Sequence, residues 1–445
     1  MKELVARIYA HGRGLRFEKY SNAILAIAAI GVAVVTFIRV FQMAVDVPIW
    51  DEWEWSRTIL AYRGGTLAFP LLWAQHNEHR MLFPQLMMLF LDSFGFWSQR
   101  RECLFSVVVV TGSLWLLWRT ARHTLQLRSA LIVTMIGSLL LFDPAQSENW
   151  LQGFQTAWFL VDFAVFGAAL LLAQTKAGPA LILGAAGLAA LAAYSSGPGL
   201  AIIPAVAVGL FVRRRALGYA PLMQWTVASM VIIGIYFWGW SPTADSMAPS
   251  LSALVSRVVA MAAVAGLPFG LGSGAIASTT LGAVGLILSA MFVVPIVREG
   301  DAAKLARATP WIVILTYGVV SSALIGYGRA ANPESTRYIT CSLMLWIGLA
   351  GVIALHPPLT VLPTIWVRIA AGLGAFVLIC YFTGTWFFGV QALSTAAAYY
   401  RRSNSILTNY QQAPDSDLAT LYPVPAFLRA QIPALVSIGQ LPEIR

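Results

Sequence analysis

The sequence predicts an all-α protein that crosses a membrane about eleven times. Of its 445 residues, 58% are hydrophobic and only 11% are charged, and the mean hydropathy is +0.73. Soluble domains carry far more charge, and long apolar runs between short polar segments are typical of polytopic membrane proteins. We therefore interpret the chain as a bundle of membrane-spanning helices with an extended first outer loop.

Eleven apolar runs have the length and composition expected of spans. They lie at about 22–44, 103–119, 129–143, 154–174, 179–194, 198–212, 223–240, 274–297, 309–326, 339–355 and 362–389. The first run lacks a small-residue cleavage site, so we expect a retained span and not a signal peptide. We divide the chain into a membrane module, residues 1–393, and a C-terminal tail of short helices, 394–445.

The basic residues predict the side of the membrane on which each loop lies. The net charge of +10 comes from small clusters between apolar runs, which fits the positive-inside rule better than a nucleic-acid-binding surface. The basic loops share the side of the N-terminus only if the apolar run 81–97 does not cross. We expect that run to lie along or dip into the outer leaflet, interrupted by Pro84 and carrying Asp92.

Most acidic residues then fall on the outer side. The predicted outer segments are the first outer loop 45–102, then 143–153, 194–198, 241–273, 327–338 and the tail from about 390. The three cysteines lie far apart in apolar runs and indicate neither a metal site nor a disulfide framework. We therefore look for function in the outer polar segments.

The stretch WDEWEW, residues 50–55, follows the first span. Its three tryptophans are expected to anchor a flat helix in the headgroup region. A partly dry cleft at this depth would raise the pKa of a carboxylate. Because an ionisable pair at the membrane edge is costly without use, we expect function for Asp51 and Glu52. For Glu54 we favour simple solvation of the helix surface.

A run of six hydrogen-bonding residues precedes the 81–97 segment. The run consists of Gln75, His76, Asn77, Glu78, His79 and Arg80. In a helix, His76 and His79 would share a face and could hold a metal, but the H-E-x-x-H spacing is absent. We favour a substrate-binding surface formed by residues 76–80 over a metal site or a loop without a ligand. Glu78 and Arg80 could also pair with each other.

The segment FDPAQSENWLQGFQ, residues 142–155, separates two spans. Proline after Asp143 disfavours helical geometry and ends the first of them. Ser147 could begin the next helix and direct its positive dipole end outward at an anion. Glu148 and Asn149 are then either capping residues or one wall of a substrate site.

The segment GYGRAANPESTRYIT, residues 326–340, carries Arg329 and Arg337 on the predicted outer side, against the positive-inside rule. Guanidinium groups there suit a phosphate or diphosphate, which they bind through two parallel hydrogen bonds. Glu334 could instead neutralise one of the arginines. We favour phosphate binding by at least one of them, with Tyr338 as an adjoining substrate-binding residue.

Together these features resemble the GT-C superfamily of membrane glycosyltransferases, which includes protein mannosyltransferases, aminoarabinose transferases and the catalytic subunit of oligosaccharyltransferases. The resemblance lies in the acidic pair Asp51-Glu52, the proline-containing segment HRMLFPQLMMLFLDSFGF, the acidic loop DPAQSEN and the late segment GRAANPESTRY. It covers the layout of about residues 20–340. The chain departs from the family where HNEHR replaces a Lys-Pro-Pro type segment and in its very short C-terminal soluble part.

The resemblance implies transfer of a sugar from a polyprenyl-phosphate donor to an outer-face acceptor glycan or lipid. A carboxylate, Asp51 first and Glu52 second, would accept the acceptor's proton and give inversion in one displacement. Outer arginines would stabilise the leaving phosphate. The implied partners are the lipid-linked donor, the acceptor and membrane lipid, and no nucleic acid. No cofactor is inferred, although some members use a divalent cation. The expected location is a bacterial inner membrane, with the site on its periplasmic side.

Three other classes are weighed against this one. A transporter or flippase for a lipid-linked sugar usually has charges in mid-span and inverted repeats; here Asp162 lies within a span, but no repeat is visible. An O-antigen ligase or polymerase typically relies on a large loop between late spans, whereas this chain concentrates its polar residues early. A scaffold would not need two acidic loops and two arginines on one side.

Overall fold

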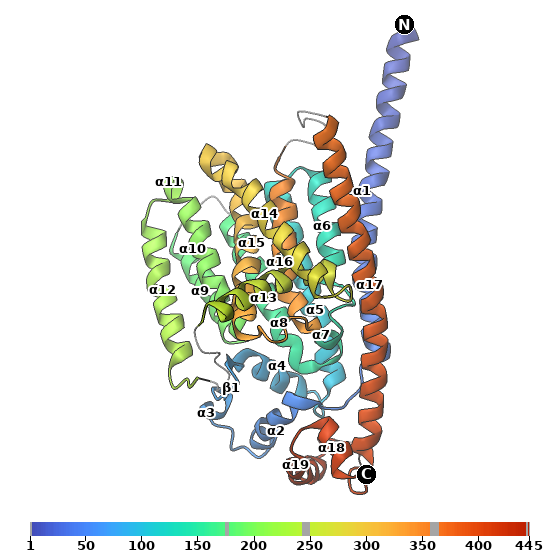
Figure 1. The fold of residues 1–445 in the computed structure, drawn as a ribbon, viewed down its shortest axis with the longest axis vertical. Helices are drawn as coiled ribbons and strands as arrows, with labels where there is room; N and C mark the ends of the chain where they lie inside the picture. The colour runs from blue at the N-terminus through green and yellow to red at the C-terminus, as the bar shows by residue number, and fades with distance from the viewer. Residues whose placement is uncertain (1, 174–177, 243–249, 357–364, 442–443, 445) are drawn as a thin grey trace.

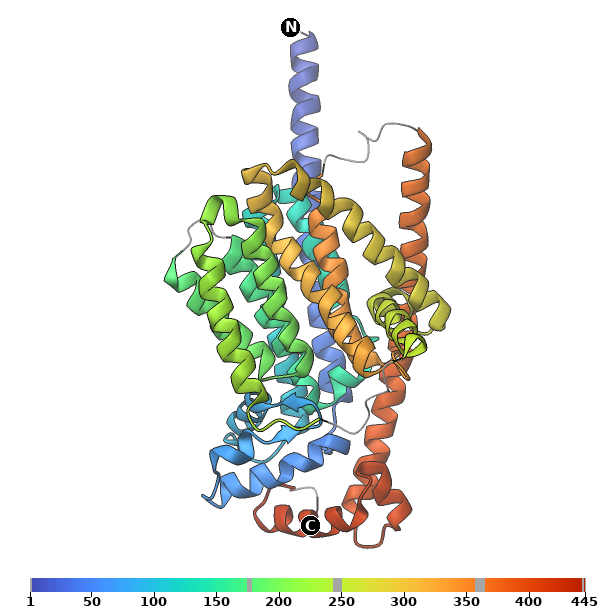
Figure 2. The same cartoon turned by 60° about the vertical axis from the view of Figure 1, so that its left-hand side comes forward.

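The computed structural model describes residues 2–173, 178–242, 250–356, 365–441 and 444. Within these residues the chain is almost entirely helical, with one two-stranded β-ribbon. Figures 1 and 2 show a bundle of helices with the first part of α1 projecting from one end. Residues 44–98 and the last two helices cover the other end, which we call the site end.

The bundle contains twelve long or medium-length helices. They are α1 (Lys2–Met43), α5 (Gln99–Thr124), α6 (Leu127–Leu141), α8 (Thr156–Ala173), α9 (Pro179–Ala193), α10 (Ile202–Val212), α12 (Ala220–Phe237), α13 (Leu251–Gly270), α14 (Ala275–Glu299), α15 (Ala302–Gly328), α16 (Ile339–Ile353) and α17 (Ile365–Thr408). In the part of the chain that is described, nine helices are long and apolar enough to cross a membrane, and α6, α9 and α10 are apolar but shorter. The chain is therefore an all-α, multi-pass membrane protein.

The eleven apolar runs predicted as spans fall on eleven of these helices, and the twelfth, α13, is the exception; residues 174 and 362–364 of these runs lie outside the described residues. Residues 241–273 are predicted as a polar outer segment, but Leu251–Gly270 form an apolar helix. This helix lies across the bundle and contacts α14, α15, α16 and α17 (Figures 1 and 2). The prediction of a polar loop here is wrong because the polar residues end at Ser250, where an apolar run long enough for a membrane helix begins.

Helices α13 and α14 approach each other closely through small residues. A Cβ atom on Gly266 would lie 1.9 Å from the carbonyl oxygen of Ser278, and one on Gly282 would lie 1.8 Å from that of Ala262. Small residues spaced four apart allow two helix backbones to touch, a common packing mode in membranes. The transverse position of α13 therefore depends on glycine at its contact with α14.

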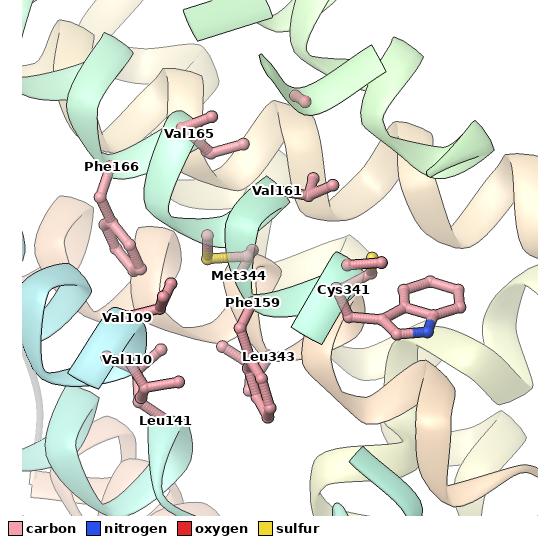
Figure 3. Packing of buried hydrophobic residues seen from close by; sticks show 14 of the residues in the cluster. Val109, Val110, Leu141, Phe159, Val161, Val165, Phe166, Cys341, Leu343 and Met344 are labelled. Carbon is pink, nitrogen blue, oxygen red and sulfur yellow. The ribbon is translucent and has the colours of Figure 1, made fainter. Parts of the chain in front are cut away.

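The buried core lies where α5, α6, α8 and α16 meet. Figure 3 shows Val109 and Val110 of α5 packed with Leu141 of α6, Phe159 of α8 and Met344 of α16, all buried. Since α7 (Ser147–Leu151) and η2 (Gly153–Gln155) connect α6 to α8 at the site end, this core fixes the base on which the site is built.

The first outer loop folds into short elements at the site end (Figure 1). They are η1 (Trp50–Trp55), α2 (Ser56–Arg63), α3 (Phe69–Leu72), β1 (Gln75–His76), β2 (His79–Arg80) and α4 (Leu82–Asp92). Helix α4, which falls on the predicted 81–97 run, has eleven residues and is apolar but shorter than the nine candidate spans. Pro84 does not interrupt it, because proline is tolerated in a first turn. Asp92 accepts a hydrogen bond from Arg63 Nε at 2.8 Å.

The C-terminal residues form short helices, as the sequence predicts for the tail, and these helices cap the first outer loop. Helix α17 continues to Thr408, past the expected boundary at residue 393, and α18 (Asp415–Leu421) and α19 (Pro425–Ser437) follow it. The cap contacts the loop where Ser56 Oγ donates to Gln431 Oε1 at 3.1 Å. The Arg57 guanidinium lies over the Phe427 ring, 5.0 Å from its centre.

Candidate functional site

The 3₁₀ helix η1 turns two of its tryptophans into the protein. Trp53 and Trp55 are 0% and 3% exposed, whereas Trp50 is 49% exposed. Trp53 packs edge-on against Trp97, with ring centres 6.4 Å apart. The prediction that all three tryptophans anchor in the headgroup region is therefore wrong for Trp53 and Trp55, whose rings fill the space beneath η1.

The buried carboxylate of Glu52 ties η1 to η2. Glu52 Oε2 accepts the backbone N–H of Ile49 at 2.9 Å, and Oε1 accepts that of Phe154 at 2.8 Å. Burial raises the pKa of Glu52 to about 8, although these hydrogen bonds act in the opposite direction. The expected rise in pKa is thus found at Glu52, which holds two segments together and is only 2% exposed.

A histidine lies between two carboxylates above this contact. His76 Nε2 is 3.3 Å from Asp51 Oδ2, and His76 Nδ1 is 3.0 Å from Glu54 Oε2. Asp51 and Glu54 are three residues apart, so a 3₁₀ helix places them on one face. Burial alone would lower the pKa of His76, but hydrogen bonds to both carboxylates raise it to about 9.

The same contacts keep both carboxylates ionised. Burial acts to raise the pKa of Asp51, but the His76 hydrogen bond and charge outweigh it and lower that pKa. The hydrogen bond from His76 likewise lowers the pKa of Glu54, against its burial. The expectation of a raised pKa at Asp51 is therefore wrong, because a cationic histidine faces it. The Asp51 side chain is 39% exposed and open to a ligand.

His76 and His79 face each other across a tight β-hairpin. The strand register pairs them directly, with Asn77 and Glu78 in the turn. Asn77 has a φ of +49°, a conformation that asparagine tolerates better than most residues. The predicted helical face for the two histidines is therefore wrong. In the described ranges, no group of three or more His, Cys, Asp and Glu is arranged to hold a metal ion.

His79 is held neutral beneath the hairpin. Its Nδ1 accepts the backbone N–H of Gly197 at 3.0 Å, so the ring proton resides on Nε2, which lies 3.7 Å from Glu78 Oε1. Burial lowers the pKa of His79 to about 4. Gly197 is the first residue of η3 (Gly197–Ala201), and a Cβ atom there would lie 2.7 Å from His79 Nδ1. Only glycine permits this close approach.

The two predicted phosphate-binding arginines meet the first outer loop and α7. Arg329 Nη2 is 2.6 Å from Glu78 Oε1, and Arg337 Nε is 3.1 Å from Glu148 Oε2. Their side chains are 40% and 42% exposed. The charge of Arg337 lowers the pKa of Asp51 further, after that of His76. Residues from four distant segments therefore form one charged cluster, which we call the Asp51 cluster.

Arg80 serves the structure and not a ligand. It is 3% exposed and donates to the carbonyl oxygens of Trp73, Tyr236 and Trp238 at 2.7, 3.1 and 2.6 Å. These contacts fasten the hairpin to the end of α12. The alternative pairing of Arg80 with Glu78 does not form, because Glu78 turns to Arg329.

Asn149 and Tyr338 are also buried. Asn149 Nδ2 donates to the Arg337 carbonyl oxygen at 3.0 Å and to Thr340 Oγ1 at 2.6 Å, which holds α7 against η4 (Thr336–Tyr338). Tyr338 packs edge-on against Trp158. The helix predicted to begin at Ser147 is the separate short helix α7, and α8 begins at Thr156.

The sequence does not predict the roles of two residues of the cluster. Glu54 contacts His76, and the hydroxyl of Tyr422, in the cap, donates to Glu54 Oε1 at 3.2 Å. The three-residue spacing of Asp51 and Glu54 was a usable signal for a shared face. No signal in the sequence connects Tyr422 to this segment, since the contact depends on how the tail folds back.

Comparisons with protein-family models, with curated proteins and with solved structures find no match to this chain. The chemistry of the site is therefore judged from its geometry. An ionised, partly exposed carboxylate can accept a proton, and exposed guanidinium groups can bind phosphate. The Asp51 cluster combines both capacities at the end of a membrane bundle.

Proposed function

We propose that the protein is a GT-C type glycosyltransferase that moves a sugar from a polyprenyl-phosphate donor to an acceptor glycan or lipid. The observation that carries this proposal is the Asp51 cluster, in which a partly exposed carboxylate and two partly exposed arginines from distant segments meet. A lipid-linked donor requires a cationic site for its phosphate at the membrane edge, next to a base for the acceptor. The cluster offers both.

In this proposal Asp51 is the base. The acceptor hydroxyl oxygen attacks the anomeric carbon, its proton passes to Asp51, and the bond from that carbon to the phosphate oxygen breaks with its electron pair on the leaving phosphate. One displacement inverts the anomeric centre. Because cationic His76 keeps Asp51 ionised, the carboxylate is available at neutral pH and accepts the proton late, as the new bond forms. Glu54 orients His76 from its other side.

The arginines serve the donor phosphate. Arg337 and Arg329 each contact one carboxylate, and a phosphate would compete with Glu148 and Glu78 for the guanidinium groups. Two parallel hydrogen bonds to each arginine stabilise the charge that develops as the phosphate leaves. Neutral His79 can donate a hydrogen bond from Nε2 to a sugar hydroxyl. Glu52 and the buried residues around the cluster position these groups.

The proposed topology places the cluster on the periplasmic side of a bacterial inner membrane. With α13 lying across the bundle, the other eleven bundle helices supply eleven crossings. The N-terminus then lies with the basic loops in the cytoplasm. The site end, with the cap, faces the periplasm.

A transfer assay in membranes tests the proposal, with radiolabelled polyprenyl-phosphate sugars as donors and extracted host glycans and lipids as acceptors. Asp51→Asn is expected to lower the rate by roughly 10²–10⁴-fold while donor binding is retained. Arg337→Ala is expected to weaken donor binding. The matched control is Asp417→Asn, an acid of α18 away from the cluster. If Asp51→Asn transfers sugar at the wild-type rate, the proposal fails.

One observation favours transport as a second candidate function. Asp162 in α8 is 1% exposed, and neither carboxyl oxygen has a hydrogen-bond partner among the residues described. Ionisable residues inside a span often mark a substrate or proton path. A flippase for lipid-linked sugar would lose translocation in Asp162→Asn and keep it in Asp51→Asn. A transferase would lose sugar transfer in Asp51→Asn and keep it in Asp162→Asn.

A further inference from the structure

A cavity of about 340 Å³ lies in the bundle, and none of its lining residues is a charged residue of the Asp51 cluster. Helices α1, α6 and α17 and the turn before α7 form its walls. Its volume lies within the range of roughly 300–1,000 Å³ that is common for small-molecule sites. The lining is apolar except for Thr36 and one charged residue, Arg39.

The cavity extends along α1 for the depth of one membrane leaflet. Its lining on this helix runs from Ala28 to Val40, and twelve steps of 1.5 Å span about 18 Å. That is roughly half of a hydrocarbon core of about 30 Å. Arg39 lies one turn before Met43, where α1 ends at the site end. In the candidate span Tyr20–Met43, the cavity therefore runs from near the site end to about the middle of the span.

Arg39 is the charged group at the headgroup end of this cavity. Within the described part of the chain it has neither a hydrogen-bond partner nor an ion-pair partner. Arg63 and Arg329, in contrast, each pair with a carboxylate. A guanidinium group beside hydrocarbon is costly without an anion. A phosphate is the anion that a membrane supplies at this depth, and guanidinium binds it through two hydrogen bonds.

We propose that this cavity binds an anionic phospholipid of the leaflet at the site end. Its phosphate contacts Arg39, and one acyl chain lies along α1 as far as Ala28. The one-leaflet depth matches an acyl chain. Trp386 of α17 and Trp150 of α7 close the other sides, so the lipid joins α1 to α17 next to the helix that carries Glu148. This binding does not depend on sugar transfer.

Native mass spectrometry of the purified full-length protein tests the proposal. Phosphatidylglycerol, phosphatidylcholine and a polyprenyl phosphate are added separately at equal concentrations. The wild type is expected to retain one phosphatidylglycerol. Arg39→Ala is expected to retain it roughly tenfold less, because charge-assisted hydrogen bonds are lost. Arg401→Ala, which removes an exposed arginine of α17 outside the cavity, is the matched control and is expected to bind as the wild type does.

A second variant tests the hydrocarbon part of the site with Arg39 intact. A Cβ atom at Gly31 would meet no atom within 4 Å, so Gly31→Leu extends into the cavity without a clash and is expected to reduce lipid retention. Thermal melting confirms that each variant is folded. The proposal is overturned if folded Arg39→Ala or folded Gly31→Leu retains phosphatidylglycerol like the wild type. Equal retention of phosphatidylcholine, or preferential retention of polyprenyl phosphate, also overturns it.

Discussion

His76 links the charge of the site to the stability of the protein. Its pKa rises from 6.5 to about 9 in the folded chain. A folded-state pKa above the unfolded value means that the contribution to stability is complete below pH 6.5 and is lost as the pH rises through about 9. Asp51, Glu54 and His79 are the titratable groups that face it.

We expect the melting temperature of the wild type to fall between pH 8 and about pH 10, and that of His76→Gln to fall less. Glu52, whose pKa rises from 4.5 to about 8, also stabilises the fold at low pH, but most of its contribution is already lost above pH 8. Between pH 8 and about pH 10, the difference in melting temperature between the wild type and His76→Gln therefore measures the contribution of His76. Parallel melting curves across the window would contradict a cationic His76.

Arg80 provides a second test at the level of one residue. Replacing it with alanine leaves three carbonyl oxygens without their donor. Hydrogen bonds from a charged group contribute about 1.5–3 kcal/mol each, so we expect Arg80→Ala to lower the unfolding free energy by about 3 kcal/mol or more. Arg80→Lys should recover little of the lost unfolding free energy, since an ammonium group cannot reproduce the planar arrangement of donors in the guanidinium group. Denaturant or thermal unfolding measures the loss, with Arg401→Ala as control.

The sequence predicts which residues meet at the site better than it predicts what each one does. Charge and topology predict that Glu148 and Arg337 lie on one side, and their side chains are in contact. The sequence favours ligand binding for Arg80 and simple solvation for Glu54. The contacts show instead that Arg80 is structural and that Glu54 belongs to the charged cluster. Arg80 is buried because carbonyl groups at the end of α12 accept its hydrogen bonds. One hydrogen bond of Glu54 forms because the cap folds back onto η1. Local sequence carries no information on either partner.

Among the elements, the HNEH segment and α13 differ most from the sequence-based prediction. A three-residue spacing of histidines suits a helix, but Asn77 and Glu78 form a two-residue turn whose strands pair. The six consecutive polar residues have no apolar periodicity, so their sequence does not distinguish a helix from a hairpin. For α13, hydrophobicity alone also fits a span. Its transverse course is determined by contacts with four other helices.

The contact between α13 and α14 gives a prediction at this scale. Gly266→Leu places a side chain where the Ser278 carbonyl lies, so α13 must move away from α14. We expect a clear drop in melting temperature. Each kcal/mol of lost unfolding free energy lowers it by roughly 4–8 °C in a small domain and by less in a chain of this size. Gly234→Leu in α12 is the matched control, because a Cβ there meets nothing within 4 Å. Equal melting temperatures for the two variants would exclude this packing.

At the scale of the whole molecule, the first outer loop and the C-terminal cap are joined at the site. The first outer loop supplies Asp51 and Glu54, and the cap holds η1 through Tyr422. Trp50 Nε1 also donates to Tyr399 in α17 at 3.4 Å. Trp50 has a φ of +52°, an uncommon conformation that the surrounding contacts must hold in place. The multi-pass helical architecture was predictable from apolar runs, whereas this closure was not, since it joins residues far apart in sequence.

The cap is therefore expected to order the Asp51 cluster. In a full-length variant with Tyr422→Ala and Phe427→Ala, Glu54 loses a donor and Arg57 loses the ring beneath it. We expect hydrogen exchange to increase in residues 50–63 and to stay unchanged in α15 and α16, which lie in the bundle. Val424→Ala is the matched control, because this side chain is 51% exposed in the same segment.

The same variant separates positioning from chemistry. If the cap orders η1, sugar transfer should fall in the Tyr422→Ala, Phe427→Ala protein while Asp51 is still present. Raising the concentration of the acceptor should restore part of the rate, because a looser site binds its substrate less well but keeps its base. Unchanged exchange in residues 50–63 would show that η1 is held by the bundle alone. In that case Glu52, which joins η1 to η2, positions this turn without help from the cap.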